Sequence, residues 1–210
     1  MVGGFMRLFI AINFDEPTVA RIMEIQQRLR EMGRGSFSHP ENLHLTLAFL
    51  GEIEPQRVRE IQEAMTQLVI PTLRLEFSSV GNFRRDGGDL WWVGLAPNHE
   101  LTLLQKELTA QLKVRGFVLE DRRFSPHITL ARKVILAEYS SSQGNTKDLR
   151  TSGNSKKQGA PGNLNKPGTI DGMQLLGEPF VTKADTVSLM LSERINGKLT
   201  YTELYKATKK

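Results

Sequence analysis

The chain contains no cysteine and no run of apolar residues long enough to cross a lipid bilayer. The absence of cysteine excludes disulfide bridges and thiolate metal sites, and it fits a reducing compartment. The longest apolar stretch near the start, residues 8–14, is interrupted by Asn13 and lacks the layout of a signal peptide. We therefore expect a cytoplasmic protein that does not associate with membranes.

Positive charge is only slightly in excess over negative charge. The 28 Lys and Arg residues against 23 Asp and Glu residues give a formal net charge of +5. A basic surface favours polyanions, including RNA, although a charge of this size fits a role in solubility equally well. With 210 residues, 39% of them hydrophobic and 24% charged, the composition is that of a globular protein with one domain or two close lobes.

Apolar periodicity predicts alternating strands and helices along most of the chain. The strands are expected at residues 7–14, 43–50, 73–77, 90–95 and from 127 onward, and a C-terminal hairpin is expected to turn at Asn196-Gly197. The helices are expected between Pro17 and Gly33, from about Pro55 to Leu68, and over 101–112. Residues 84–89 have the composition of a tight turn.

The segment from residue 140 to 169 departs from this pattern. It consists largely of Ser, Gly, Asn, Lys and Pro and has almost no apolar residues, so it cannot bury enough surface to order itself. We expect a single bilobal domain over residues 1–210 with a flexible insertion at 140–169. A passive linker is the simpler interpretation, and its lysines keep a loop that grips the substrate as the alternative.

The tetrapeptide His-x-Thr-Leu occurs twice, at His44–Leu47 and at His127–Leu130, with an offset of 83 residues. The same offset relates further positions: Gly33 and Gly116, Leu29 and Leu112, Ile25 and Leu108, Ile10 and Val93, and Ile12 and Leu95. In both halves a helical run ends at a glycine and the His follows 11 residues later. This indicates one strand–helix–strand unit used twice.

Side chains at positions i and i+2 of a strand share a face. His44 and Thr46 should therefore point one way, with Leu45, Leu47 and Phe49 directed into the core. His127 and Thr129 should follow the same rule. An amphipathic strand with a polar outer face explains one such motif, but the repetition favours two polar faces that line one central groove.

Two imidazoles at one site suit displacement at phosphorus. A neutral imidazole takes a proton from the attacking water, and a protonated one gives a proton to the leaving oxygen. The threonine hydroxyls can donate to anionic oxygens. No metal is expected, because His-x-Thr is not a ligand pair and no third ligand lies at a suitable spacing. His39 and His99 lack a threonine partner and are expected on the surface.

Taken together, four segments resemble the RNA 2',3'-cyclic phosphodiesterase group (LigT-like, ThpR) of the two-histidine phosphoesterase superfamily. The segments are Arg7–Ile12, Glu41–Gly51, Leu90–Leu95 and Phe124–Arg132. The resemblance covers about residues 6–133 and resumes near 184–204. The 140–169 segment is longer than this group leads us to expect.

The resemblance implies an α+β fold with two antiparallel sheets, related by a pseudo-twofold axis and flanked by helices, around a central groove. It implies opening of an RNA 2',3'-cyclic phosphate to a 2'-phosphate without a metal, and a reverse activity that joins tRNA halves through a 2'-5' linkage. We expect no cofactor and a monomeric protein. By motif position His44 is the proton donor, His127 is the proton acceptor, and Thr46 and Thr129 hold the phosphate.

Arg132 matches a family arginine that follows the second motif, so it is a candidate to neutralise the phosphate. Strict alternation would place it on the apolar side with Leu130, and only a strand end or a bulge would bring it round. A surface or structural role is the alternative.

Four further residues are candidates for substrate binding. Arg122 and Arg123 precede the second motif and are placed to meet an RNA backbone, although a solvated turn is the simpler interpretation. Trp92 and Phe83 are candidates to stack on a base, although a buried core position is the more common one for such residues.

Two other functions stay open. The chain could be another enzyme of the same superfamily, one that acts on 2'-5' oligonucleotides or on a small cyclic nucleotide such as ADP-ribose cyclic phosphate. The chain could also be an RNA-binding module that recognises phosphate-terminated ends and turns over poorly. Intact His and Thr residues in both motifs count against the module.

Overall fold

The computed structural model describes residues 4–137 and 172–209. The segment expected to form a flexible insertion, residues 140–169, lies outside the described residues. Within the described ranges, none of the helices combines the length and the apolar character that crossing a membrane requires.

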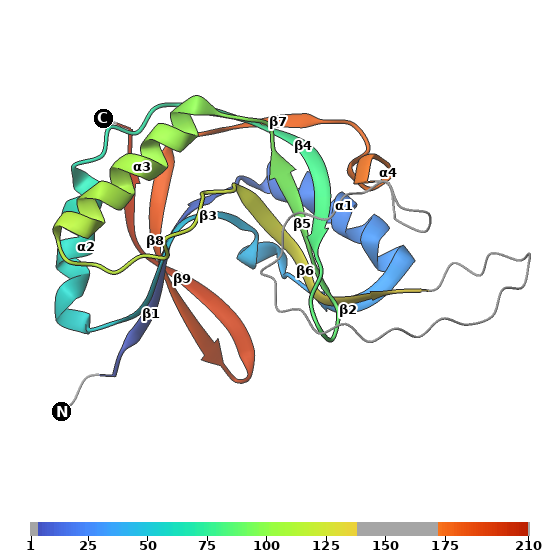
Figure 1. The fold of residues 1–210 in the computed structure, drawn as a ribbon, viewed down its shortest axis with the longest axis horizontal. Helices are drawn as coiled ribbons and strands as arrows, with labels where there is room; N and C mark the ends of the chain where they lie inside the picture. The colour runs from blue at the N-terminus through green and yellow to red at the C-terminus, as the bar shows by residue number, and fades with distance from the viewer. Residues whose placement is uncertain (1–3, 138–171, 210) are drawn as a thin grey trace, which may run out of the picture.

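Two antiparallel sheets form the framework, as expected for the α+β class (Figure 1). The first sheet has the strand order β3-β1-β8-β9 and the second has the order β2-β6-β5-β4-β7. The strands are β1 (Met6–Asn13), β2 (Gly33–Phe37), β3 (His44–Ile53), β4 (Leu73–Phe83), β5 (Asp89–Leu95), β6 (His127–Leu136), β7 (Phe180–Ala184), β8 (Thr186–Ile195) and β9 (Lys198–Thr208).

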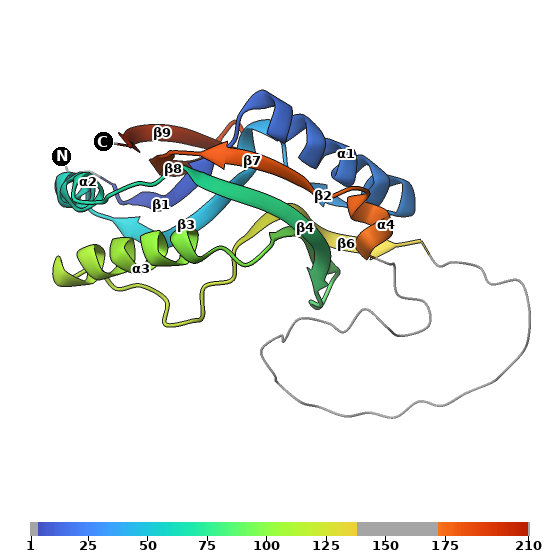
Figure 2. The same cartoon turned by 90° about the horizontal axis from the view of Figure 1, so that it is seen from above.

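Each sheet is covered by helices, and the helix from each half of the repeat packs on the sheet of the other half. The helices are α1 (Glu16–Met32), α2 (Val58–Thr66), α3 (His99–Val114) and α4 (Gly172–Leu176), with 3-10 turns at Pro40–Asn42 and Pro55–Arg57. Helix α1 follows β1 but packs on β2 and β6 of the second sheet, whereas α3 follows β5 but packs on β3 of the first sheet. Figure 2 shows α1 and α4 at one end of the molecule and α2 and α3 at the other.

The repeat predicted from the sequence is present in three dimensions. β1 and β3 correspond to β5 and β6, and β8 flanks β1 as β4 flanks β5. The helix positions that repeat after 83 residues, Ile25 with Leu108 and Leu29 with Leu112, are all buried. The pseudo-twofold arrangement of the two sheets therefore follows from an internal repeat.

Local signals explain the helix boundaries. The Asp15 side chain caps α1 by accepting a hydrogen bond from the Thr18 amide at 3.1 Å, and the Asn98 side chain caps α3 in the same way from the Leu101 amide at 2.8 Å. The glycines that end the two helices act differently. Gly116 has a φ of 77°, which glycine adopts most easily, whereas Gly33 is extended and a Cβ there would lie 2.7 Å from the Ile135 carbonyl oxygen.

The C-terminal hairpin turns at Asn196 and Gly197, as predicted. Both residues have positive φ, 51° and 80°, which a two-residue hairpin turn of type I' requires. Several elements were not expected from the sequence: β2, β7, α4, the two 3-10 turns, and the extension of β3 through Gly51 to Ile53. β2 was missed because Gly33–Phe37 has no apolar alternation, and it owes its strand form to pairing with β6.

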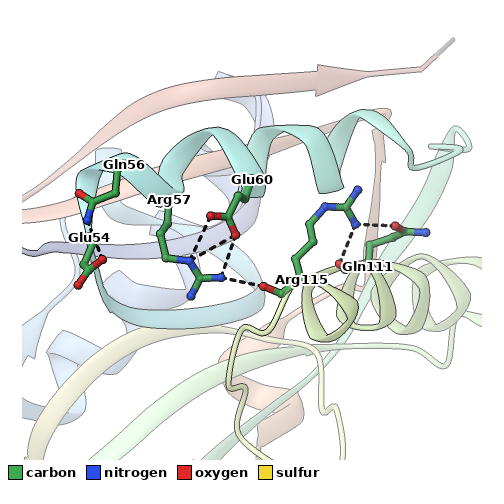
Figure 3. A network of polar contacts seen from close by, with 6 residues as sticks. All are labelled: Glu54, Gln56, Arg57, Glu60, Gln111 and Arg115. Carbon is green, nitrogen blue, oxygen red and sulfur yellow. Dashed lines mark hydrogen bonds and ion pairs between the residues drawn. The ribbon is translucent and has the colours of Figure 1, made fainter.

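A polar network ties the end of α3 to the start of α2 (Figure 3). Arg57 donates hydrogen bonds to the Glu60 carboxylate, the shortest at 2.9 Å, and to the Arg115 carbonyl at 2.7 Å. The guanidinium also lies 4.0 Å from the centroid of the Phe117 ring. These contacts fix residues 115–117, from which the chain runs to the second motif at His127.

Candidate active site

The two motif strands contact each other across the boundary between the sheets, where Cα atoms of β3 and β6 approach within 8 Å. His44 and Thr46 on β3 are half-buried, as are His127 and Thr129 on β6, and the residue between each pair is buried. The predicted alternation therefore holds over both motifs. We call the surface formed by these four residues the motif face.

A β-bulge follows each motif at the same place in the repeat. Leu47 has no partner in the pairing of β3 with β1, and Leu130, 83 residues later, has none in the pairing of β6 with β5. A bulge moves the side chains that follow it to the other face of the strand. Arg132 is consequently exposed and joins His127 on the motif face, which is the condition the sequence set for it to reach the phosphate.

The first bulge corrects the expectation for Phe49. Strict alternation placed this side chain in the core with Leu47, but Phe49 is 37% exposed and stands at the position equivalent to Arg132. The guanidinium of Arg7 on β1 lies 4.9 Å from the centroid of its ring. The extra residue in β3 is the physical cause, because it shifts the pleat by one position.

Glutamines hold both bulges, and each comes from the helix of the other half. Gln26 on α1 donates to the Leu130 carbonyl at 2.7 Å and to the Ser38 carbonyl at 2.8 Å. Gln105 on α3 donates to the Leu47 carbonyl at 3.3 Å. The Leu130 carbonyl also accepts from the Ser38 amide at 2.9 Å, so Gln26 is its second donor. These side-chain hydrogen bonds add to the backbone hydrogen bonds around each bulge. The exchanged helices therefore stabilise the irregularity that shapes the site.

Both imidazoles are oriented by the backbone in the same way. His44 Nδ1 lies 2.9 Å from the Asn42 carbonyl oxygen, and His127 Nδ1 lies 2.8 Å from the Ser125 carbonyl oxygen. A carbonyl only accepts hydrogen bonds, so Nδ1 carries the proton in both rings. In the neutral tautomer, Nε2 of each ring is then the basic nitrogen.

The Thr46 hydroxyl is hydrogen-bonded to the basic nitrogen of the first ring. Its Oγ1 lies 3.1 Å from His44 Nε2. Since the neutral ring has no proton on Nε2, the threonine hydroxyl is the donor. When His44 becomes protonated, Nε2 turns into a donor and the Thr46 hydroxyl proton is released for another acceptor.

Aromatic rings enclose each histidine. The His44 ring centroid lies 4.7 Å from that of Phe9 and 5.2 Å from that of Tyr201, which meets it edge to face. Phe9 comes from β1 and Tyr201 from β9, and their own centroids are 4.9 Å apart. The first imidazole therefore has apolar surface on two sides.

His127 has a looser enclosure of the same kind. Its ring centroid lies 5.8 Å from that of Phe83 and 6.4 Å from that of Trp92. Trp92 stands 83 residues after Phe9 and so occupies the equivalent position in the repeat. Figure 1 shows β5 and β6, which carry Trp92 and His127, side by side in the second sheet.

Enclosure makes both imidazoles less basic. Burial is the largest cause that lowers the pKa of His44, to about 4, and the Arg132 and His127 charges act in the same direction. Burial likewise lowers the pKa of His127, assisted by the charges of Arg122 and Arg132. In both rings the hydrogen bond to the backbone carbonyl opposes the shift.

Arg132 is the cation that the two motifs share. Its charge lowers the pKa values of His44, His127 and Tyr201, so its field reaches both halves of the site. Within residues 4–137 and 172–209, no carboxylate forms an ion pair with it. A half-enclosed site with an unpaired guanidinium and two imidazoles is suited to an anion.

Comparison with known proteins identifies the family of this chain. The sequence profile described as LigT like Phosphoesterase matches residues 12–92. An RNA 2',3'-cyclic phosphodiesterase of Thermotoga maritima is 36% identical over 131 residues, which are 60% of this chain and 70% of that protein. One of Archaeoglobus fulgidus is 32% identical over 128 residues, 60% of this chain and 72% of that protein. The chain belongs to the LigT-like phosphoesterase family.

The fold of the phosphoesterase agrees with this assignment. The crystal structure of Escherichia coli LigT in its apo form superposes with a TM-score of 0.68, covering 98% of each chain at 23% identity. At this identity the superposition supports the shared fold. The family resemblance expected from the sequence is confirmed.

The arginines before the second motif are exposed. Arg122 pairs with Glu120 at 2.7 Å, and its charge still contributes to the lowered pKa of His127. Arg123 is exposed as well. This placement fits a solvated turn at the edge of the site. His39 and His99 are also exposed, as expected.

Trp92 and Phe83 lie at the site and not in the hydrophobic core, which the sequence had favoured. The buried indole is that of Trp91, which is 2% exposed, while Trp92 and Phe83 are half-buried beside His127. The Trp92 ring lies so close to Gly81 that a Cβ there would be 2.5 Å from it. Glycine at this position leaves room for the indole to lie flat on the strand.

Three residues around His44 were not predicted from the sequence: Phe9, Asn42 and Tyr201. Asn42 supplies the carbonyl that orients the ring, and its side chain donates to the Leu199 carbonyl on β9 at 3.1 Å. Only the position of Phe9, opposite Trp92 in the repeat, offered a signal. Tyr201 lies outside both motifs and reaches the site through the pairing of β9 with β8.

The described part of the chain contains no group of three or more His, Asp or Glu side chains that could hold a metal ion. That the reaction needs no metal stays a prediction. A cavity of about 420 Å³ adjoins the first motif, with Asn13, Leu43 and Met190 among its lining residues. Asn13 lies directly opposite His44 in the pairing of β1 with β3, which places the cavity beside the motif face, although none of the four motif-face residues lines it.

Proposed function

We propose that this phosphoesterase hydrolyses RNA 2',3'-cyclic phosphate ends to 2'-phosphates without a metal ion, with His44 as proton donor and His127 as proton acceptor. The observation that carries the proposal is the matched pair of imidazoles, each with Nδ1 bonded to a backbone carbonyl and Nε2 left for chemistry, beside the unpaired Arg132. The activity printed for the relatives from Thermotoga maritima and Archaeoglobus fulgidus supports the substrate class.

In the proposed reaction His127 Nε2 takes a proton from water, and the water oxygen attacks phosphorus in line with the 3' oxygen. The bond from phosphorus to the 3' oxygen breaks, and His44 Nε2 gives its proton to that oxygen. One water is consumed, and the product carries a 2'-phosphate and a 3'-hydroxyl. Arg132 and the Thr129 hydroxyl stabilise the negative charge on the phosphate oxygens.

Thr46 enters only when the donor is charged. With His44 neutral, the Thr46 hydroxyl is occupied by Nε2 at 3.1 Å. Protonation of His44 frees this hydroxyl for a phosphate oxygen, so loading the acid and binding the phosphate support each other. A bound phosphate anion also raises the pKa of His44, which burial holds at about 4 in the free protein.

The in-line geometry places the terminal nucleoside. The 3' oxygen belongs to its ribose, so the nucleoside lies on the His44 side of phosphorus, where the cavity next to Asn13 offers about 420 Å³. The His127 side is left to water. Ligation of tRNA halves through a 2'-5' linkage would place a ribose hydroxyl of the second RNA end there, with His127 taking its proton and His44 again protonating the 3' oxygen. The two histidines would exchange roles when that 2'-5' linkage is cleaved back to the cyclic phosphate. Arg122 and Trp92 are then the candidate contacts for that second RNA end.

The decisive experiment offers the full-length protein a short RNA that ends in a 2',3'-cyclic phosphate, with EDTA present, and assigns the phosphate position in the product. We expect a 2'-phosphate. His44→Ala and His127→Ala should each lower the rate by roughly 100- to 10,000-fold. His39→Ala is the matched control, since this histidine is exposed, and it should turn over like the parent.

Near-normal turnover by either motif variant would rule out the two-imidazole mechanism. Loss of activity in EDTA that added zinc or magnesium restores would identify a metal enzyme. Turnover of small cyclic nucleotides or 2'-5' oligonucleotides without turnover of the cyclic RNA end would assign a different substrate within the same chemistry.

A further inference from the structure

Tyr201 is the residue at the motif face that neither motif supplies. It stands on β9, opposite Ser192 of β8, more than 70 positions after the second histidine. Its ring closes the pocket around His44 together with Phe9, at centroid distances of 5.2 and 4.9 Å. The strand pairing of the first sheet therefore places a phenol directly beside the first imidazole.

The Tyr201 hydroxyl is available for a ligand. In the part of the chain that the structure describes, it has no hydrogen-bond partner, although the residue is half-buried. Burial raises the pKa of this phenol, against the opposing charges of Arg132 and Arg7. The group therefore stays protonated at neutral pH and acts as a hydrogen-bond donor.

We propose that the Tyr201 hydroxyl donates a hydrogen bond to a non-bridging phosphate oxygen of the substrate, alongside Arg132. The inference rests on the proposed function and assigns a further phosphate contact within that site. The Tyr201 ring contacts the His44 ring, and the charge of Arg132 acts on both groups. The unpaired guanidinium and the unpaired phenol are complementary to the same anion.

A hydroxyl at this place fills a gap in the first half of the site. Thr46 cannot bind phosphate while its proton is shared with His44 Nε2 at 3.1 Å, which is the arrangement in the free protein. Tyr201 carries no such commitment, so it can meet the phosphate before His44 is protonated. The phenol then holds the anion, and the anion raises the proton affinity of the neighbouring imidazole.

Tyr201→Phe tests this, because it keeps the ring that packs on His44 and removes only the hydroxyl. Tyr205→Phe is the matched control: it lies on the same strand, and its hydroxyl meets Thr66 Oγ1 at 2.9 Å on the side of α2. Binding of inorganic phosphate and of adenosine 2'-phosphate to the full-length proteins would be measured by titration calorimetry. The imidazole signals in NMR would be followed to place each ligand.

Loss of a hydrogen bond to a charged group should weaken both ligands by roughly 10- to 100-fold in Tyr201→Phe. Adenosine, which lacks the phosphate, should bind all three proteins alike. Equal phosphate affinity in Tyr201→Phe and the parent, within about twofold of each other, would overturn the inference, as would an equal loss in Tyr205→Phe.

Failure of the proposed function gives a different result. A parent protein that does not open RNA cyclic phosphates, but whose phosphate affinity still depends on the Tyr201 hydroxyl, would refute the substrate and support the contact. A parent that opens them and binds phosphate equally well with or without this hydroxyl would refute the contact and support the substrate.

Discussion

Lowering the assay pH from about 8 to about 6.5 should raise kcat/KM for a 2',3'-cyclic phosphate. The reactive form of the proposed mechanism has His44 protonated and His127 neutral. Burial lowers the pKa values of both imidazoles. A lowered pKa means that a ring gives up its proton at a lower pH than free imidazole does, so acidification restores the charged donor.

The structure sets the size of the effect. With a pKa of about 4, His44 is protonated in about one free molecule in 1,000 at pH 7. Above the pKa of His127, the fraction in the reactive form falls about tenfold for each pH unit. Because the pKa of His127 lies below its usual value, the change from pH 6.5 to pH 8 should lower kcat/KM by about 15- to 30-fold. The phosphodiester keeps one negative charge throughout, so the substrate does not contribute to this slope.

The assay is a series of initial rates on one cyclic phosphate at constant ionic strength, analysed separately for kcat/KM and kcat. Because the bound phosphate raises the pKa of His44, kcat should hold to a higher pH than kcat/KM. His39→Ala should follow the parent profile. A kcat/KM that stays level, or rises, between pH 6.5 and pH 8 would refute the assignment of His44 as an enclosed acid.

Two substitutions test the surroundings of the motifs. Arg132→Gln removes a charge that lowers the pKa values of both imidazoles. The pH at which kcat/KM begins to fall should therefore increase, and inhibition by phosphate should weaken. An unchanged pH profile would show that this charge does not act on the two histidines. Gln26→Met removes the buried amide that donates to the Leu130 and Ser38 carbonyls and should cost about 0.5–1.5 kcal/mol in urea unfolding, because the Leu130 carbonyl keeps the Ser38 amide as a donor. Gln27→Met, at the exposed neighbouring position, should cost almost nothing. Equal unfolding midpoints for the two variants would contradict the stabilising role of the Gln26 hydrogen bonds.

The elements that the sequence predicts well are those specified by local chemistry. Asn196 and Gly197 adopt positive φ more readily than other residues, so the hairpin is encoded in two positions. The stripe of Leu101, Leu104, Leu108 and Leu112 is buried because its spacing follows one face of a helix. The motif histidines and threonines could be identified because the same His-x-Thr pair, on one face of a strand, occurs again 83 residues later.

The sides taken by Phe49 and Arg132 depend on contacts that are distant in sequence. Each side chain is turned by a bulge, and each bulge carbonyl is held by a glutamine from the helix of the other half. Alternation within one strand contains no record of that hydrogen bond. The adjacent buried pairs in each strand, at residues 47–48 and 130–131, were the visible sign of a shift in the pleat.

Tyr201 could not be found from motif spacing for a related reason. Its place beside His44 depends on β9 pairing with β8, β8 with β1, and β1 with β3, a chain of three antiparallel pairings. Each register must be known before the side chain can be placed. β9 also contains a shift next to Glu203, so counting residues along the strand would put Tyr201 and Tyr205 on one face, whereas they lie on opposite ones.

Two copies of one motif pose a chemical problem, since identical imidazoles cannot divide the work of acid and base. The aromatic surroundings remove the equivalence. Phe9 and Tyr201 enclose His44 more tightly than Trp92 and Phe83 enclose His127, with centroid distances of 4.7 and 5.2 Å against 6.4 and 5.8 Å.

The more enclosed imidazolium is the stronger acid, and the less enclosed imidazole is the stronger base. The enclosure thus favours proton donation by His44 and acceptance by His127, the same assignment that motif position implies. Its cost is that the free protein holds few molecules in the reactive protonation state. A bound anion offsets this cost by raising the pKa of His44 most when phosphate is closest. His44 should then be protonated chiefly in the complex, which is why kcat and kcat/KM must depend differently on pH.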